Sequence, residues 1–255
     1  MRKDIFKIIK YANSKGMNTS IVTNGTLVNG TVAKQLSKSG LNNIYFSIDG
    51  TKDVDDKIRE KEGMFEKTIG NMKNLLEIKG RKLRVSVISV LMNQNLNDMS
   101  GLIALVKKMH ADSFVMQPMH SQGSESAFSI KSDKSNLSIP KSKYKKIDRI
   151  IDKLMELKKE NPNFIENSVI YLELARRFLK NEALRFECLA GFSFCGIDAR
   201  GSVYPCLYQK PIGNVFNSSL KEIWKSDLYN KTRHRMKSCS KCLLLCHHRF
   251  LLSGI

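Results

Sequence analysis

Hydrophobic positions in the first 120 residues switch repeatedly between helical spacing and short strand-like runs. Amphipathic helices are predicted where apolar residues recur every three or four positions, at 5–12, 32–39, 65–76 and 98–109. Strands are predicted from apolar or alternating runs at 19–23, 44–49, 83–91 and 114–116. Asp98 is expected to cap the last of these helices. Because strands and helices alternate, we predict an α/β fold with βαβ units and a parallel sheet.

Polar residues directly after the predicted strands are the first candidates for a small-molecule site, because ligands of such folds bind beyond the carboxyl ends of the strands. They lie in Thr-Asn-Gly at 23–25, in Ser-Ile-Asp-Gly at 47–50, at 93–95 and near Gln117. In the second strand Ser47 and Asp49 share one face with Tyr45, and apolar residues form the other face. This pattern predicts a barrel-like arrangement with a polar cavity. The alternative, that Asn-Gly and Asp-Gly only form turns, explains the same residues equally well.

The rest of the chain suggests three parts. Residues 121–139 are rich in Ser, Lys and Gly and predict a long loop, and two helices follow at 142–160 and 168–180. We therefore divide the chain into a barrel-like part (1–140), a helical connector (141–185) and a cysteine-rich module (186–255).

Composition limits the possible partners and location. No apolar run approaches the roughly 20 residues that a bilayer span needs, so we expect a cytoplasmic protein with no membrane partner. The formal net charge is +19, but the lysines are spread along helices and no aromatic nucleic-acid motif accompanies them, which argues against a nucleic-acid partner. An acidic peptide substrate is compatible with this charge.

All six cysteines lie in the last third of the chain. They are Cys188, Cys195, Cys206, Cys239, Cys242 and Cys246. In a reducing compartment such clustering indicates a metal site rather than disulfides. A hairpin turning at Gly201 is expected to bring the first three together, a capping box at 219–222 predicts a short helix, and Cys239-x2-Cys242 can place two thiolates on one metal. Six ligands fit neither one nor two four-coordinate sites, so some ligands are shared or come from elsewhere.

The cysteine pattern leaves the metal open. Iron–sulfur clusters and zinc both use Cys-x2-Cys turns. A structural zinc site could be formed by Cys239, Cys242 and Cys246 with His247 or His248. An iron–sulfur centre would use cysteines alone.

The spacing Cys188-x12-Gly201-x4-Cys206, followed by Gly213-Asn214, a Leu-Lys-Glu-Ile-Trp helix and a Cys-x2-Cys tail, resembles the SPASM domain of radical S-adenosylmethionine (radical SAM) enzymes. The Thr-Asn-Gly and Ser-Ile-Asp-Gly segments, with Asp-Lys-Ile-Arg at 56–59 and Gly-x-Phe at 63–65, resemble the partial (β/α)6 barrel of the same family. The resemblance covers nearly the whole chain.

The resemblance implies a cofactor for each half. Ser47 and Asp49 would lie near the adenosyl ribose or methionine of S-adenosylmethionine, Asn24 at an adjoining strand end, and Arg59 beside a carboxylate. Cys188, Cys195 and Cys206 would hold one auxiliary [4Fe–4S] cluster. Cys239, Cys242 and Cys246 would contribute to a second, unless Cys246 closes the first. The family's substrates are peptides or proteins.

Two motifs of the family are absent from this sequence: the Cys-x3-Cys-x2-Cys loop of the radical-generating cluster and the Gly-Gly-Glu-Pro segment. We therefore expect a partial barrel lacking its first strands, in a chain that is a fragment or degenerate member truncated at both ends. On this interpretation it retains auxiliary clusters and requires a missing N-terminal segment. Two alternatives remain open: a non-catalytic auxiliary-cluster partner that presents a peptide to a complete radical SAM enzyme, or a structural zinc protein.

Overall fold

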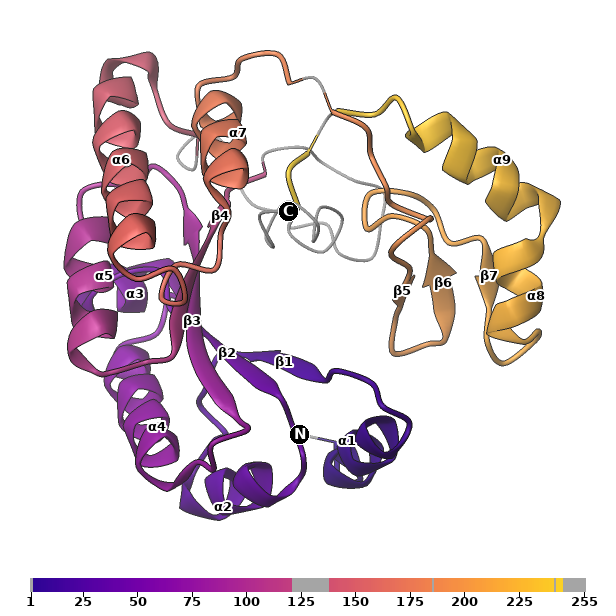
Figure 1. Ribbon diagram of the computed structural model, residues 1–255, viewed down its shortest axis with the longest axis horizontal. Helices are drawn as coiled ribbons and strands as arrows, with labels where there is room; N and C mark the ends of the chain where they lie inside the picture. Colours follow the sequence, from indigo (N-terminus) through magenta and orange to yellow (C-terminus); the bar gives the residue numbers. More distant parts are fainter. Residues whose placement is uncertain (1, 121–137, 185, 241, 245–255) are drawn as a thin grey trace. The chain divides into compact units, whose positions relative to one another are not determined.

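The computed structural model describes residues 2–120, 138–184, 186–240 and 242–244 (Figure 1). The chain divides into two compact units, which are taken one at a time below. The first contains Met1–Gln117 and Ser142–Asn167, and the second contains Pro118–Lys141 and Ser168–Ile255.

The first unit is built on a four-stranded sheet with the order β1-β2-β3-β4. Its strands are β1 (Ser20–Thr23), β2 (Asn43–Ser47), β3 (Arg84–Leu91) and β4 (Ser113–Pro118). β2 runs parallel to both β1 and β3. The helices of this unit are α1 (Ile5–Ser14), α2 (Gly30–Lys38), α3 (Lys52–Ile58), α4 (Met64–Ile78), α5 (Met99–Lys108) and α6 (Tyr144–Glu160), the last preceded by a 3-10 turn at Lys141–Lys143. Sequential strands are joined by helices, which is the βαβ topology that the hydrophobic pattern predicts.

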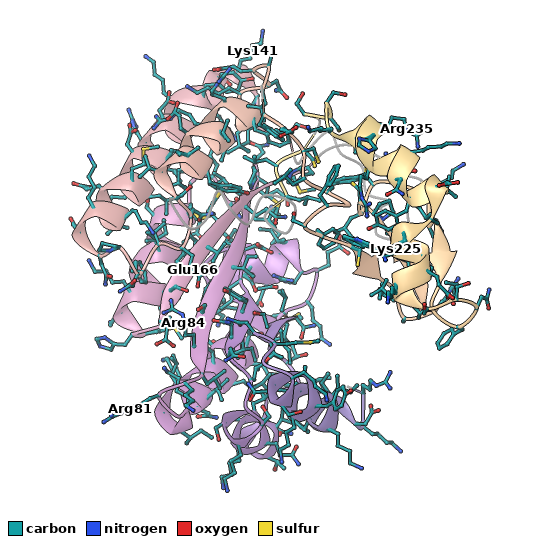
Figure 2. All side chains as sticks on the ribbon, turned by 45° about the vertical axis from the view of Figure 1, so that its right-hand side comes forward. Arg81, Arg84, Lys141, Glu166, Lys225 and Arg235 are labelled. Carbon is teal, nitrogen blue, oxygen red and sulfur yellow. The ribbon has the colours of Figure 1, made fainter. Side chains whose placement is uncertain are left out.

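The two faces of the sheet differ as the alternation along β2 predicts. Ile44, Phe46 and Ile48 are fully buried on the face that packs against the helices. The opposite face is polar: Tyr45 Oη donates to Glu166 Oε2 at 2.9 Å, and Ser113 Oγ bonds both Glu166 Oε1 at 2.5 Å and Ser86 Oγ at 2.7 Å. Arg84 adds an ion pair to Glu166 at 3.7 Å, and Figure 2 labels both side chains. The predicted α/β fold with a polar sheet face is confirmed.

Helix and strand positions agree closely with the predictions, with some differences. Helices α3 and α9 (Asp227–Met236) were not predicted. The prediction that the Asp98 side chain caps α5 is wrong. Asp98 does occupy the N-cap position, but its carboxylate accepts hydrogen bonds from the Thr51 amide and, at 2.8 Å, from Thr51 Oγ1. Asp98 therefore ties the loop after β2 to the start of α5 instead of satisfying the helix amides.

The second unit contains α7 (Val169–Leu179), a small sheet and two further helices. The sheet consists of β5 (Gly196–Ile197), β6 (Ser202–Tyr204) and β7 (Gly213–Asn214), all antiparallel, and the helices are α8 (Leu220–Lys225) and α9. The predicted hairpin is confirmed. Its turn uses Gly201 at φ +80°, a conformation that favours glycine. The capping box between Ser219 and Glu222 is also present.

Some predictions fall at unit boundaries or outside the described residues. The predicted connector is divided, since α6 belongs to the unit with the parallel sheet and α7 to the unit with the cysteines. Most of the predicted loop, 121–137, lies outside the described residues, as do Cys246, His247 and His248. In the part of the chain that the structure describes, every helix is too short or too polar to cross a bilayer.

Substituting Gly25 tests the turn after β1. Gly25 has φ +76°, and a Cβ there would lie 2.7 Å from Phe46 Cδ1 and 2.8 Å from Thr68 Cγ2. We expect Gly25→Ala to lower the free energy of unfolding by about 2 kcal/mol or more, because backbone strain adds to a steric clash. Gly70→Ala in α4 is the control. No atom lies within 4 Å of the added methyl, so it should stabilise by about 0.5–1 kcal/mol. Urea unfolding followed by far-ultraviolet circular dichroism measures both. Equal effects would contradict the described turn.

Candidate functional site

Asp49, directly after β2, connects three segments at the carboxyl edge of the sheet. Its side chain accepts from the Val90 amide of β3 at 2.8 Å, and its carbonyl accepts from Asn95 Nδ2 at 2.7 Å. Its own amide donates to Asp55 Oδ1 in α3 at 2.7 Å. Asp49 is 7% exposed and Asn95 is fully buried. The residue therefore fixes the end of β2 to β3, to the loop after β3 and to α3.

Arg59 completes this cluster from the end of α3. Its Nη2 donates to Asp49 Oδ2 at 2.8 Å and to the Ser47 carbonyl at 2.9 Å, and its Nε lies 3.6 Å from Asp55 Oδ1. Burial raises the pKa of Asp49, and the Val90 amide and the Arg59 charge oppose that shift. Burial likewise raises the pKa of Asp55. Arg59 thus pairs with two carboxylates of this chain.

Asn24 lies at the end of β1, next to the end of β2 in the sheet. The register pairs Thr23 of β1 with Phe46 of β2. Asn24 and Ser47 are the residues that follow this pair, one on each strand. The Asn24 carbonyl accepts from Thr68 Oγ1 of α4 at 2.8 Å, and its exposed side chain accepts from Thr26. The loop after β1 is thereby fixed on α4, with the Asn24 amide group at the surface.

Asn24, Ser47, Asp49 and Arg59 thus lie at one edge, the place where this fold class binds ligands. S-adenosylmethionine carries hydroxyl, carboxylate and ammonium groups, and the amide of Asn24 and the hydroxyl of partly exposed Ser47 have matching chemistry. Asp49 and Arg59 already bind each other. Sequence reasoning missed Asp55, whose i,i+4 spacing to Arg59 was the available signal.

Four cysteines lie near one another in the second unit. Cys188 and Cys206 are buried in one apolar cluster with Ala190 and Met236, and Cys239 packs against it. Burial raises the pKa of the thiols of Cys188, Cys206 and Cys242, and the proximity of one or more of the other cysteines of this group of four raises each of them further. Burial, the largest cause, raises the pKa of Cys206 to about 11 and that of Cys242 to about 12. These sulfurs therefore carry protons near neutral pH unless a cation replaces them.

Backbone amides point at three of these sulfurs. The Tyr208 amide lies 3.4 Å from Cys206 Sγ, and the amides of Ala190 and Leu244 donate to the sulfurs of Cys188 and Cys242, partly offsetting the effect of burial on their pKa. Amide donors of this kind stabilise thiolates and tune iron–sulfur clusters.

The segment that carries Cys242 is held at the following residue. The Leu243 amide donates to His120 Nε2 at 2.9 Å, and the Leu243 carbonyl accepts from Tyr171 Oη at 2.8 Å. At the other end of the cluster, the Cys188 amide donates to the Lys237 carbonyl at 3.1 Å. His120 and Tyr171 are positioning residues that sequence reasoning missed, because they are distant in sequence from every cysteine motif.

Cys195 lies in a different environment. It packs against a second apolar cluster formed by Val203, Ile223 and Tyr229. The expectation that the hairpin brings Cys188, Cys195 and Cys206 together thus holds for Cys188 and Cys206, while Cys195 belongs to the neighbouring cluster. The Tyr229 hydroxyl is buried without a hydrogen-bond partner among the described residues, and burial raises the pKa of Tyr229 to about 12.

The geometry of the thiols bears on the choice of metal. Within the described ranges, no three His, Cys, Asp or Glu side chains are arranged to hold a single metal ion. A zinc ion needs four ligands at roughly 2.0–2.3 Å, so a zinc site among these residues is unsupported. Four cysteine donors with amides directed at their sulfurs suit an iron–sulfur cluster. The histidines of the zinc alternative, and Cys246, lie outside the described residues.

Two family models match separate parts of the chain. Residues 1–106 match the radical SAM superfamily, and residues 188–243 match SPASM, an iron–sulfur cluster-binding domain. The chain therefore belongs to the radical SAM proteins with a SPASM domain. The resemblance stated from the sequence is confirmed.

Curated relatives are similar over almost the whole chain. Fe-coproporphyrin III synthase of Methanosarcina barkeri is 25% identical over 97% of this chain, and AdoMet-dependent heme synthase of Nitratidesulfovibrio vulgaris is 24% identical over 95%. The chain spans 64% of the length of the first and 67% of the second.

Solved structures share the fold. Native anSMEcpe with bound AdoMet and the Cp18Cys peptide has a TM-score of 0.63 at 17% identity, over 98% of this chain and 69% of its own. SuiB of Streptococcus suis has a TM-score of 0.64 at 18% identity, over 99% of this chain and 59% of its own. At these identities the similarity establishes the fold alone.

Removing Arg59 tests the carboxyl-edge cluster. Arg59→Met leaves two buried carboxylates without their cation, so we expect a loss of about 2–4 kcal/mol at pH 7. Without Arg59, the pKa of Asp49 should rise further above its unfolded value. The folded variant then holds more protons than its unfolded state, and its stability increases as the pH falls. The deficit should therefore shrink between about pH 7 and about pH 4.

Lys57→Met is the matched control for this variant, because Lys57 is an exposed cation on the same helix. It should change the stability by about 0.5 kcal/mol or less. Chemical unfolding at both pH values measures the effects. A deficit in Arg59→Met that is equal at both pH values would remove the electrostatic account.

Proposed function

We propose that this chain binds an auxiliary [4Fe–4S] cluster through Cys188, Cys206, Cys239 and Cys242, as part of a radical SAM enzyme. The observation that carries the proposal is the proximity of these four thiols, with backbone amides aimed at three of their sulfurs. Thiolate ligands and N–H···S hydrogen bonds are what such a cluster requires. When bound, the cluster would supply one-electron transfer. Cys195, which packs against the neighbouring apolar cluster, would not be a ligand.

The protein's own residues would prepare this site in two ways. Burial raises the pKa of Cys188, Cys206 and Cys242 and keeps these three thiols protonated in the metal-free protein, so cluster binding must release their protons and place iron against the sulfurs. His120 and Tyr171 form hydrogen bonds with the backbone of Leu243. These bonds would hold the neighbouring residue, Cys242, in position for the cluster.

The first unit would contribute part of a pocket for S-adenosylmethionine. Asn24 and Ser47 would contact the cofactor, while Asp49 and Arg59 would hold the edge of the sheet in place. The 255 residues contain no Cys-x3-Cys-x2-Cys motif. We propose that the radical-generating cluster is bound by residues outside this sequence, or by a complete radical SAM partner protein.

For the substrate we propose an iron porphyrin with carboxylate side chains. The curated relatives that match over 95–97% of the chain are named for Fe-coproporphyrin III and heme synthesis. The net charge of +19 suits a polyanionic substrate. A peptide or protein substrate, expected from the sequence, remains the second candidate, supported by the same charge if the peptide is acidic.

Iron and sulfide analysis tests the cluster ligands. On protein reconstituted without oxygen, Cys206→Ala should lose at least about half of the iron and acid-labile sulfide, because it removes a ligand of the cluster. Cys195→Ala is the matched control and should retain nearly all of it. Equal losses in both variants would contradict this ligand set and would favour Cys188, Cys195 and Cys206 as ligands of one cluster. About one zinc per chain without sulfide would overturn the cluster proposal.

Porphyrin binding tests the substrate. Titration with iron coproporphyrin III, followed by its Soret absorbance, should show saturable binding. Its tetramethyl ester should bind at least about tenfold more weakly, because it lacks the carboxylates that a protein of high positive charge attracts. Equal binding of acid and ester, or tighter binding of an acidic peptide, would contradict an anionic porphyrin substrate. Neither result would affect the cluster assignment.

A further inference from the structure

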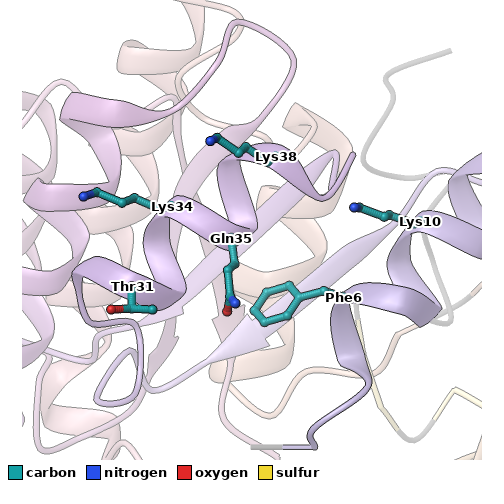
Figure 3. Close-up of a pocket in the computed structure, with 6 residues that line it drawn as sticks. All are labelled: Phe6, Lys10, Thr31, Lys34, Gln35 and Lys38. Atoms are coloured by element: carbon teal, nitrogen blue, oxygen red, sulfur yellow. The ribbon is translucent and has the colours of Figure 1, made fainter.

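A pocket of about 410 Å³ lies between α1 and α2, and it shares no residue with either candidate site described above. Its lining residues are Phe6, Lys10, Thr31, Lys34, Gln35 and Lys38. In Figure 3 the Phe6 ring and the Gln35 amide approach each other between the two helices, and Lys10 extends from α1 toward α2. The pocket thus combines one aromatic wall, two neutral polar groups and three cations.

The two helices that form this pocket are fixed to the rest of the unit. Ile9 of α1 is 4% exposed, and Ala33 and Leu36 of α2 are buried in the core. Asn13, at the end of α1, donates from Nδ2 to the Gly40 carbonyl beyond α2 at 2.9 Å. Because each helix is anchored by its apolar side, Lys10, Lys34 and Lys38 face the solvent.

The charges of the pocket are uncompensated within the described part of the chain. Neither α1 nor α2 contains an acidic residue, and no carboxylate pairs with Lys10, Lys34 or Lys38 there. Residues 1–38 contain seven Lys or Arg and one acidic residue, Asp4, which pairs with Arg2 at 2.5 Å. Lys34 and Lys38 are one helical turn apart, a spacing at which like charges repel. A bound anion would relieve this repulsion.

We propose that this pocket binds a small organic polyanion with two or more phosphate or carboxylate groups. The acidic groups would pair with Lys10, Lys34 and Lys38, Gln35 and Thr31 would donate hydrogen bonds, and Phe6 would cover the apolar part of the ligand. S-adenosylmethionine does not fit this description, because its sulfonium and ammonium groups are cationic. The site is therefore distinct from the pocket proposed at the carboxyl edge of the sheet, and does not depend on the metal content of the protein.

Isothermal titration calorimetry with two probes, inorganic pyrophosphate and tricarballylate, tests the proposal on the whole chain at low salt. We expect saturable binding of at least one probe, and the tighter of the two identifies phosphate or carboxylate as the preferred group. Lys34→Gln together with Lys38→Gln should weaken binding at least about tenfold, because two charge-assisted contacts are lost. Both positions are exposed, so circular dichroism should be unchanged.

The matched control is Lys221→Gln together with Lys225→Gln on α8, which removes two exposed lysines at the same spacing from the other unit. It should change the affinity by less than about twofold. Equal weakening by both pairs would mean that the probes sense only the overall charge, and would overturn the proposal. The absence of binding of either probe at millimolar concentration would overturn it as well.

Discussion

The buried carboxylate of Asp49 is the constraint on which the first unit depends. A charged group that is 7% exposed must have hydrogen-bond donors close by, and here they come from β3 and from the end of α3. Satisfying Asp49 fixes the end of β2, the entry to α3 and, through Asn95, the loop after β3. The edge where this fold binds ligands is thus held by polar contacts rather than by apolar packing, which is confined to the opposite face of β2.

In the second unit the candidate metal ligands are themselves part of the apolar packing. Its two apolar clusters are small, and cysteines form part of each. A buried thiol packs as a small hydrophobe while it is protonated, so the same side chains can stabilise the metal-free unit and serve as ligands. The Tyr229 hydroxyl, buried without a partner in the described part of the chain, lies in the cluster against which Cys195 packs.

Hydrophobic periodicity was sufficient to predict the parallel sheet, because each strand of the first unit is a short apolar or alternating run and each main helix has one apolar face. It failed for α3, whose sequence Lys-Asp-Val-Asp-Asp-Lys-Ile is mostly charged. The Asp98 prediction failed because a capping residue was matched with the nearest amides, whereas its carboxylate binds Thr51, 47 positions away. At the metal site, cysteine spacing identified the module. It did not reveal which thiols lie close together. The hairpin positions Cys206, and α9 positions Cys239. The hydrogen bonds of Leu243 with His120 and Tyr171 position Cys242.

Trp224 is the only tryptophan of the chain. It lies in the second unit, with its ring 5.0 Å from that of Tyr229 and the Arg233 guanidinium 4.8 Å from its centroid. The intrinsic tryptophan fluorescence of this protein therefore reports on the cysteine-bearing unit and is silent for the parallel sheet. Because iron–sulfur centres absorb broadly and quench nearby fluorophores, the emission also provides an optical signal of occupancy that requires no label. Unfolding of the cysteine-bearing unit can accordingly be followed by itself through this emission.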